Sequence, residues 1–81
     1  MFDGVATFKL AEGGNHEEAL RICNDRITEN PDDSLALFIA AYALTKASKW
    51  GLSYNLLLRA AALSPNRHEI HNNLGNCCIN M

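Results

Sequence analysis

The chain has 81 residues, nearly half of them hydrophobic, and a formal net charge of −2 at pH 7. This length allows one domain at most, and the charge argues against a nucleic-acid surface, which would show a clustered basic excess. The longest apolar run, Leu35–Leu44, is too short to cross a bilayer, so neither a nucleic acid nor a membrane is an expected partner.

A first helix is predicted over Phe2–Glu12. Its apolar residues follow a roughly helical spacing and are Phe2, Val5, Ala6 and Leu10. Asp3 lies near its start, where a carboxylate suits the positive end of the helix dipole. Gly13 and Gly14 are expected to end the helix, because glycine takes the left-handed conformation without steric cost.

A second helix is predicted directly after this glycine pair. Asn15 can cap it, and Glu18, three residues later, can reach back in a capping box. The apolar stripe expected to face the core is Ala19, Leu20, Cys23 and Ile27. Arg21 is spaced to pair with Glu17 and with Asp25, which lie four residues away on either side.

A third helix is predicted over about Ser34–Ala47 and a fourth over about Lys49–Leu63. The third helix is apolar on nearly every face, which predicts burial on several sides. The core residues expected on the fourth helix are Leu52, Leu56, Leu57, Ala60, Ala61 and Leu63. Trp50 and Tyr54 are expected on its more exposed side, with a polar ring atom near water.

A fifth helix is predicted after Pro65. Asn66 and Glu69 are spaced to form a second capping box at its start. Its expected core row is Ile70, Leu74 and Cys78, with Cys77 and Met81 alongside. No partner helix follows in the sequence, so one side of the fifth helix is expected to lack intramolecular cover.

The third and fourth helices form one helix–turn–helix unit, Asp33–Arg67, and both helices lie between Pro31 and Pro65. The repeat spacing, from Pro31 to Pro65, is about 34 residues and holds two helices, which matches the period of tetratricopeptide (TPR) repeats. In this unit the motif positions of that family hold Leu37, Ala40, Ala41, Leu44, Ser53, Leu57 and Pro65. Shifts by the repeat spacing lead back to Ala19, Cys23 and Pro31 and forward to His71, Leu74, Gly75 and Cys78. Over residues 13–81 the chain therefore resembles the TPR family, with the Leu74-Gly75 pair of its motif matched letter for letter.

The resemblance implies an all-α fold, a right-handed superhelix of antiparallel helix pairs with five helices. Residues 1–81 would form a single TPR-like domain. Repeat 1 would span about 1–33, repeat 2 about 34–67, and the first helix of a third repeat about 68–81. A stack of this kind has a concave side, which is lined by the first helix of each repeat.

Zinc-type ligands gather in the fifth helix at His68, His71, Cys77 and Cys78. One straight helix cannot place all four around a tetrahedral ion, and no C-x2-C pair is present. Cys23, Cys77 and Cys78 are expected to be mostly buried, whereas a reactive thiolate needs a partly exposed, electropositive site. Three cysteines do not make an even disulfide framework, so a reducing, cytoplasmic setting is predicted. We therefore expect no metal, no cofactor and no catalytic residue.

Two stripes at helical spacing are predicted to line the concave side. On the third helix the stripe is Leu35, Phe38, Tyr42 and Lys46, and on the fifth it is Glu69, Asn72, Asn76 and Asn80, with Asn73 beside it. The groove would be apolar at one end and amide-rich at the other, and asparagine side chains suit the backbone of an extended peptide. In the alternative interpretation, Leu35 and Phe38 only pack on the first repeat, and the asparagines form only a solvated face.

The predicted function is therefore non-catalytic protein–protein interaction, with a protein or peptide partner in this groove. One type of TPR domain binds the C-terminal carboxylate of chaperones with basic residues on this face. This chain carries Leu35 and Glu69 at positions where such a clamp would need basic residues, so this kind of partner is not expected. One alternative is self-assembly into a homo-oligomer through the uncovered last helix, at a surface made of Ile70, Leu74, Cys77, Cys78, Ile79 and Met81. Another is an N-terminal TPR fragment of a larger enzyme, because Asn73-Leu74-Gly75-Asn76 resembles the asparagine ladder of O-linked N-acetylglucosamine transferases.

Overall fold

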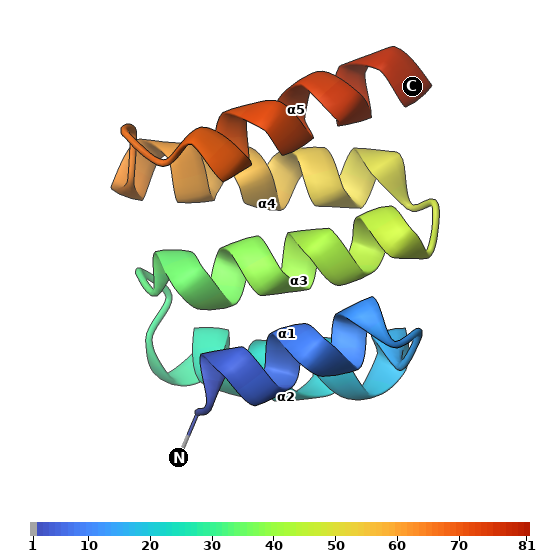
Figure 1. Ribbon diagram of the computed structural model, residues 1–81. Helices are drawn as coiled ribbons and strands as arrows, with labels where there is room; N and C mark the ends of the chain where they lie inside the picture. The colour runs from blue at the N-terminus through green and yellow to red at the C-terminus, as the bar shows by residue number, and fades with distance from the viewer. Residues whose placement is uncertain (1) are drawn as a thin grey trace.

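Five α-helices follow one another along residues 2–81, the part of the chain that the computed structural model describes, and no strand occurs among these residues (Figure 1). The helices are α1 Gly4–Glu12, α2 His16–Glu29, α3 Ser34–Lys46, α4 Trp50–Leu63 and α5 His68–Asn80. The predicted all-α class and the number of helices are confirmed. No helix in the described part of the chain is long and apolar enough to cross a membrane.

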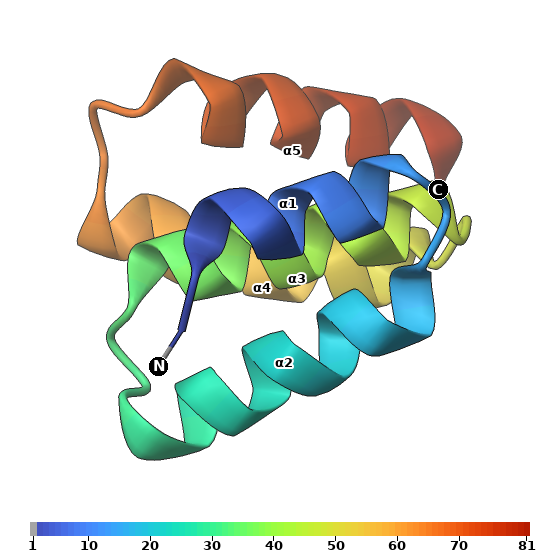
Figure 2. The same ribbon diagram turned by 60° about the horizontal axis from the view of Figure 1, so that its bottom comes forward.

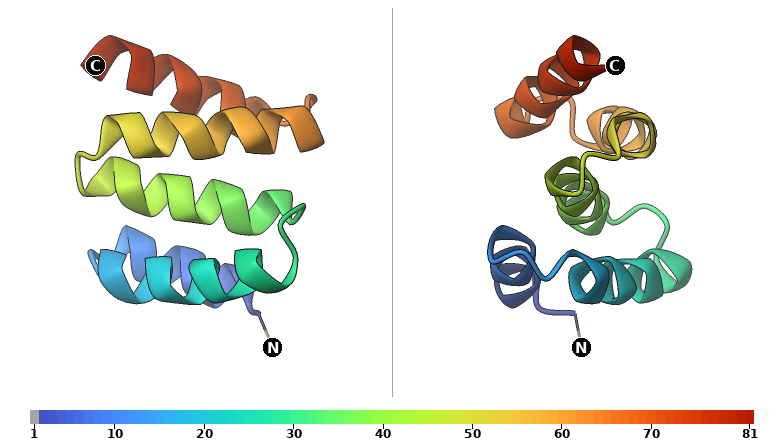
Figure 3. Two further views of the ribbon diagram at one scale, coloured as in Figure 1. Left: turned by 180° about the vertical axis from the view of Figure 1, so that it is seen from behind. Right: turned by 90° about the vertical axis from the view of Figure 1, so that its right-hand side faces the viewer.

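The helices form two layers, with α1, α3 and α5 in one and α2 and α4 in the other (Figure 3, right). Each helix runs antiparallel to the next and packs against it (Figure 1), and α3 also contacts α1 and α5 within its own layer. Figure 2 shows α2 running back beneath α1, while α1 lies alongside α3. Helix α3 is therefore the centre of the structure and contacts all four other helices.

The turns between helices repeat their backbone hydrogen bonds at the repeat spacing, the distance along the chain from Pro31 to Pro65. After α1, the amide of Asn15 donates to the carbonyl of Leu10 (2.9 Å), and after α3 the amide of Lys49 donates to the carbonyl of Leu44 (2.8 Å). Asn30 donates to Arg26 after α2, and Ser64 donates to Ala60 after α4, each at 2.8 Å. Two successive helical hairpins thus share the same backbone construction.

The two turns within the hairpins also share a residue with positive φ. This residue is Gly14 in the first turn (φ 92°) and Ser48 in the second (φ 60°), again one repeat spacing apart. Glycine takes such a conformation without a steric penalty. The prediction that the glycine pair closes the first helix is therefore confirmed at Gly14, whereas the second turn makes the same shape with a serine.

Aspartate side chains begin two of the first-layer helices. A carboxylate oxygen of Asp3 accepts a hydrogen bond from the amide of Ala6, and Asp33 accepts one from Ala36, both at 3.1 Å. Such caps satisfy amides that have no partner inside the helix. They explain why α1 begins after Asp3 rather than at Phe2.

The two predicted capping boxes are wrong. Asn15 precedes α2 without a side-chain cap, and Glu18 instead forms an ion pair with Arg21 one turn further on. Because Arg21 turns to Glu18, the predicted pair with Glu17 is also absent, while the longer contact with Asp25 (3.8 Å) is present. At α5 the helix begins one residue later than a cap by Asn66 would place it, after Arg67, which makes no side-chain cap.

The core is built around α3, on which eight residues are buried. Ser53 of α4 is fully buried and donates its hydroxyl to the carbonyl of Ala41 (2.8 Å), and the same hydroxyl lies 2.7 Å from that of Thr45. The buried cluster around α3 also contains Leu57 and Ala60 of α4, Cys23 of α2, and Ile70 and Cys77 of α5. Burial of α3 on several sides and of the α2 stripe is therefore confirmed.

Of the four apolar residues predicted for the first helix, Phe2 and Leu10 pack against the core, but the other two do not. Val5 and Ala6 are exposed, and the buried residues of this helix are Thr7 and Ala11. The Thr7 hydroxyl donates to the carbonyl of Asp3 (2.6 Å), so a β-branched polar residue occupies a core position without an unpaired oxygen. The apolar spacing did not reveal the burial of Thr7, because threonine is not counted as an apolar residue. It can be buried here because its hydroxyl donates to a carbonyl at the start of its own helix.

The predicted inner face of α4 is also corrected. Leu52 and Leu63 are exposed, whereas Trp50 and Tyr54 pack against the core. The buried face of α4 is centred on Ser53, Leu57 and Ala60. Trp50 and Tyr54 lie beside this face, while Leu52 and Leu63 project from its other flank.

Candidate functional site

The candidate site is the outer face of the layer that contains α1, α3 and α5. Seen along the helices, α3 is set back between α1 and α5 (Figure 3, right). This face therefore bends inward at its middle helix. The predicted apolar stripe belongs to this middle helix, and the predicted amide stripe belongs to α5, one of the two helices that flank it.

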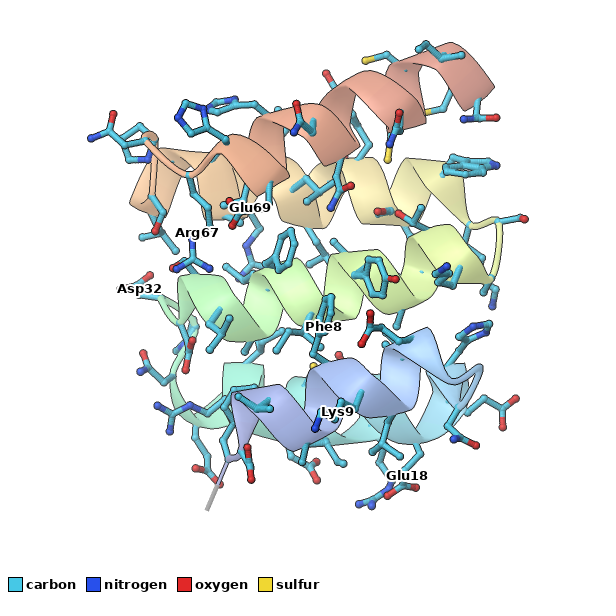
Figure 4. All side chains as sticks on the ribbon, viewed as in Figure 1. Phe8, Lys9, Glu18, Asp32, Arg67 and Glu69 are labelled. Carbon is cyan, nitrogen blue, oxygen red and sulfur yellow. The ribbon has the colours of Figure 1, made fainter. Side chains whose placement is uncertain are left out.

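Aromatic side chains from two helices meet at the bottom of this face. The ring of Phe8 stacks on that of Tyr42, with centroids 4.7 Å apart, and lies 6.4 Å from and nearly parallel to the ring of Phe38. Figure 4 shows Phe8 pointing from α1 toward α3. The ammonium of Lys46 lies 5.5 Å from the centre of the Tyr42 ring, which is within the range of a cation–π contact.

Phe8 is a residue of this face that the sequence analysis missed. It stands one repeat spacing before Tyr42, so the same shift that connects the turns also connects these two aromatic side chains. One more shift leads to Asn76 on α5. The position of Phe8 could therefore have been predicted from the sequence by extending the repeat spacing back into the first helix.

An apolar hollow of about 270 Å³ lies between α1 and α3. It is lined by Gly4, Val5, Phe8, Leu35, Phe38 and Ile39, together with Lys9 and Glu12. Leu35 keeps 39% of its surface exposed there, whereas Phe38 keeps only 9%. Of the predicted stripe, Leu35 is thus accessible to a ligand, and Phe38 serves mainly as the floor.

Gly4 allows α1 to approach α3 closely at one end of this hollow. A Cβ atom built on Gly4 would lie 2.7 Å from Cδ2 of Leu35, which is nearer than such atoms come in real structures. A larger residue at position 4 would therefore push the Leu35 side chain aside. The shape of the hollow depends on this glycine.

The predicted amide stripe lies along α5. Glu69, Asn72, Asn76 and Asn80 are exposed and Asn73 is half-buried. Figure 4 shows Glu69 at the start of α5, on the side toward α3. The amide nitrogen of Asn80 donates to the carbonyl of Asn76 (2.8 Å), while the side chains of Asn72 and Asn76 extend from an exposed helical face. The structure thus places the apolar and amide-bearing parts of the predicted groove on successive helices of one layer.

Ion pairs of the described residues lie away from this face. Arg26 of α2 donates to Asp33 at the start of α3 (2.7 Å), and its guanidinium lies 5.9 Å from the ring of Phe2. Burial alone would raise the pKa of Asp33, but hydrogen bonds from Arg26 and from the amide of Ala36 outweigh it and hold the pKa below its ordinary value. These contacts join the two hairpins and are structural.

The cysteines differ from one another in exposure. Cys23 and Cys77 are fully buried, and burial, with a smaller contribution from Asp33, raises the pKa of the Cys23 thiol to about 12. Cys78 is exposed, so the prediction that it belongs to the core row is wrong. Ile70 and Cys77 are seven residues apart, which is two helical turns, and this pair rather than Cys78 faces α4.

Burial also divides the surface predicted for self-assembly. Ile70 and Cys77 have no exposed area, and Leu74 packs partly on the core, so these three residues are used inside the molecule. The residues that remain exposed are Cys78, Ile79 and Met81. Ile79 and Met81 project from different sides of the helix end, since each residue turns the helix by about 100°.

Metal ligands are not assembled in the described part of the chain. Among residues 2–81, no three His, Cys, Asp or Glu side chains come together in a way that would hold a metal ion. A ring nitrogen of His71 lies 2.8 Å from the carbonyl of Pro65, so this side chain bonds to the turn that precedes its own helix.

No protein-family model matches the chain, and neither a curated protein nor a solved structure matches it. Its function is therefore inferred from its own residues and from their arrangement in space.

Proposed function

We propose that this chain is a non-catalytic, TPR-like interaction module that binds an extended segment of a partner protein across the face formed by α1, α3 and α5. The observation that carries the proposal is the apolar hollow between α1 and α3, which stands beside an exposed row of asparagines on α5. A peptide needs both features, an apolar anchor site for a side chain and amide groups for its backbone.

The recurrence of the turns supports the TPR-like part of the proposal. The hydrogen bonds after α1 and α3 and those after α2 and α4 recur at the repeat spacing, which equals the period of TPR repeats. A superhelix of such hairpins would present the first helix of each repeat on its concave side. The proposal takes the layer of α1, α3 and α5 (Figure 3) as that side, because α1 and α3 are the first helices of the two hairpins.

The chemistry of the face favours an uncharged, partly apolar peptide. Leu35 and Val5 offer exposed aliphatic surface at the hollow, which suits an aliphatic or aromatic anchor residue of the ligand. Each asparagine offers two N–H donors and one carbonyl acceptor and can therefore pair with either group of a peptide bond. Lys46 and Glu69, at opposite ends of their helices, give the face no single sign of charge.

The proposal is tested by selecting ligands from a phage-displayed library of random peptides and measuring the affinity of the selected peptides by fluorescence anisotropy. Tyr42→Ala combined with Asn76→Ala is expected to weaken binding about tenfold or more, which corresponds to roughly 1.4 kcal/mol. The matched control is Asn55→Ala, which removes an exposed asparagine from α4 in the other layer. Circular dichroism checks that both variants keep their helices.

A clear negative result is available. If selected peptides bind the Tyr42→Ala, Asn76→Ala variant as tightly as the unchanged chain, or if Asn55→Ala is the variant that weakens them, the face of α1, α3 and α5 is not the binding site. If the chain selects no peptide at all, the proposal fails, and the apolar residues of the hollow serve only for packing and the asparagines only as a solvated face.

A further inference from the structure

The apolar hollow between α1 and α3 has two charged side chains among the residues that line it. They are Lys9 and Glu12, and all other lining residues are apolar. Both side chains are exposed, and among residues 2–81 neither takes part in an ion pair. Because they lie three residues apart on α1, they are neighbours on the helix surface. A group bound in the hollow therefore meets apolar walls and, where the hollow opens to solvent, one ammonium and one carboxylate.

The size of the hollow limits the size of its occupant. A dry cavity of about 150 Å³ holds one benzene ring, and pockets for drug-sized ligands begin at about 300 Å³. The hollow measures about 270 Å³ and lies between these two values. It therefore suits one large side chain with two fused rings, whereas a single aliphatic side chain would leave much of it empty.

The side chains around the hollow favour an aromatic ring that carries a hydrogen-bond donor. An ammonium such as that of Lys9 is attracted to the face of an aromatic ring, and most strongly to that of tryptophan. The carboxylate of Glu12 can accept a hydrogen bond, and the indole ring of tryptophan carries one N–H donor and no acceptor. Phe8 and Phe38 contribute two rings to the lining, and a further aromatic ring gains from packing against them beyond its buried area.

Gly4 sets the width of the hollow. A Cβ atom at this position would lie 2.7 Å from Cδ2 of Leu35 and 3.6 Å from Cε2 of Phe2. A methyl group on residue 4 would therefore displace the end of the Leu35 side chain, and Leu35 is itself a lining residue. The space for a wide ring depends on the absence of a side chain at position 4.

We infer that the hollow is a binding site for the indole ring of a tryptophan, and that this tryptophan is the anchor residue of the bound segment. The inference rests on the proposed function, because it names the side chain by which an extended segment is held. The ring lies against Phe8 and Phe38, with its N–H toward Glu12 and one face toward Lys9. Gly4 is the residue that determines how large an anchor is accepted. The asparagines of α5 bind the backbone and do not distinguish one anchor from another.

The experiment replaces the unknown segment by three small probes, the N-acetyl amides of tryptophan, of benzothienylalanine and of leucine. Benzothienylalanine has the two fused rings of tryptophan with a sulfur atom in place of the N–H group. Each probe is titrated into the ¹⁵N-labelled chain, and its dissociation constant is obtained from the amide signals of Val5, Phe8 and Leu35. The tryptophan probe is expected to bind about tenfold more tightly than the leucine probe, as one ring–ring contact and one hydrogen bond together provide.

Two substitutions test the roles of Gly4 and Glu12. Gly4→Ala should weaken the tryptophan probe about tenfold and the leucine probe about twofold or less, because the displaced Leu35 side chain narrows the hollow. Gly51→Ala is the matched control and should change neither probe, since Gly51 also lies in the first turn of a helix and a Cβ atom there meets no atom within 4 Å. Glu12→Ala should weaken the tryptophan probe about threefold, as loss of one hydrogen bond does, and leave the benzothienylalanine probe unchanged. Circular dichroism checks that each variant keeps its helices.

Three results would each overturn the inference. The first is that the leucine probe binds as tightly as the tryptophan probe, or that no probe shifts the signals of the hollow. The second is that Gly4→Ala leaves the tryptophan probe unchanged. The third is that Glu12→Ala acts alike on the two ring probes, since the indole N–H would then have no part in binding.

Failure of the inference and failure of the proposed function give different results. If selected peptides depend on Tyr42 and Asn76 but the tryptophan probe does not bind in the hollow, the inference fails and the proposed function stands. If the tryptophan probe binds with the expected dependence on Gly4 and Glu12, but selected peptides are insensitive to Tyr42→Ala with Asn76→Ala, the indole site stands. Binding of an extended segment across the three helices then fails.

Discussion

Helices α3 and α5 stand at the same position of the repeat, yet they have different environments. Eight of the thirteen residues of α3 are buried, but only two of the thirteen residues of α5. Helix α3 contacts all four other helices, whereas α5 packs mainly on α4. The burial of a residue in this fold is therefore decided by the helices that flank it as much as by its own helical stripe.

The residues have the character that these environments require. Where α3 is covered it carries Leu37 and Ala41, and at the counterpart positions α5 carries His71 and Gly75. On the candidate site, Tyr42 of α3 stacks on Phe8 of α1, while its counterpart Asn76 is exposed. The two helices thus supply different chemistry to one face, aromatic at the centre and amide-bearing at the edge.

The largest expected effect contrasts the two helices at one position. Leu37→Ala should lower the free energy of unfolding by roughly 2–5 kcal/mol, because it leaves a cavity in the centre of the core. His71→Ala, at the counterpart position, should change it by about 0.5 kcal/mol or less, as is usual for exposed residues. Urea unfolding of the two variants makes the comparison, and equal losses would show that α5 is as deeply packed as α3.

The helix starts provide a smaller contrast. Asp33 caps α3, and Asp33→Ala should cost about 0.5–2 kcal/mol of stability, as removal of a cap does. Because the pKa of Asp33 is held below its ordinary value of 3.8, the contribution of its carboxylate is fully present above that pH and is lost as the pH falls through the lower pKa of the folded state.

Urea unfolding of the unchanged chain and of Asp33→Asn as a function of pH measures this contribution. The difference in stability between the two should be constant near neutral pH and should shrink as the solution becomes strongly acidic. A difference that grows on acidification would contradict the depressed pKa and with it the role of the Arg26 hydrogen bond.

The smallest expected effect is a gain. Arg67 precedes α5 with an extended backbone (φ −86°, ψ 108°) close to that of Asp33 (φ −79°, ψ 96°), but it makes no side-chain cap. Arg67→Ser should add such a cap and stabilise the chain by about 0.5–1 kcal/mol. Serine avoids a new negative charge beside Glu69, and a thermal melt that shows no gain would mean that the start of α5 is not capped as α3 is.

The sequence was sufficient to predict the five helices. The order of the helices was predicted from the apolar residues at helical spacing, the glycine pair and the two prolines. At most helix ends the predicted bound differs from the observed one by only a few residues. The nearly continuous apolar character of α3 also predicted correctly that this helix lies at the centre. These features depend on the conformational preferences of glycine and proline and on the helical spacing of apolar residues.

The details that the sequence did not reveal depend on neighbouring helices. Val5 and Leu52 are apolar but exposed, and Trp50 is packed against the core instead. The capping boxes failed because the spacing of a motif does not decide between competing partners, and Glu18 pairs with Arg21. At the candidate site, Phe8 was missed because its partners Phe38 and Tyr42 lie on another helix.

The proposal that a peptide binds across α1, α3 and α5 is tested most directly by nuclear magnetic resonance. A selected peptide is titrated into the ¹⁵N-labelled chain, and the amide signals are followed residue by residue. We predict that the shifts concentrate on Phe8, Leu35, Tyr42 and Asn76 and their neighbours, while α2 and the outer side of α4 stay unchanged. Shifts confined to α2 and α4, or spread evenly over the molecule, would contradict the proposed function.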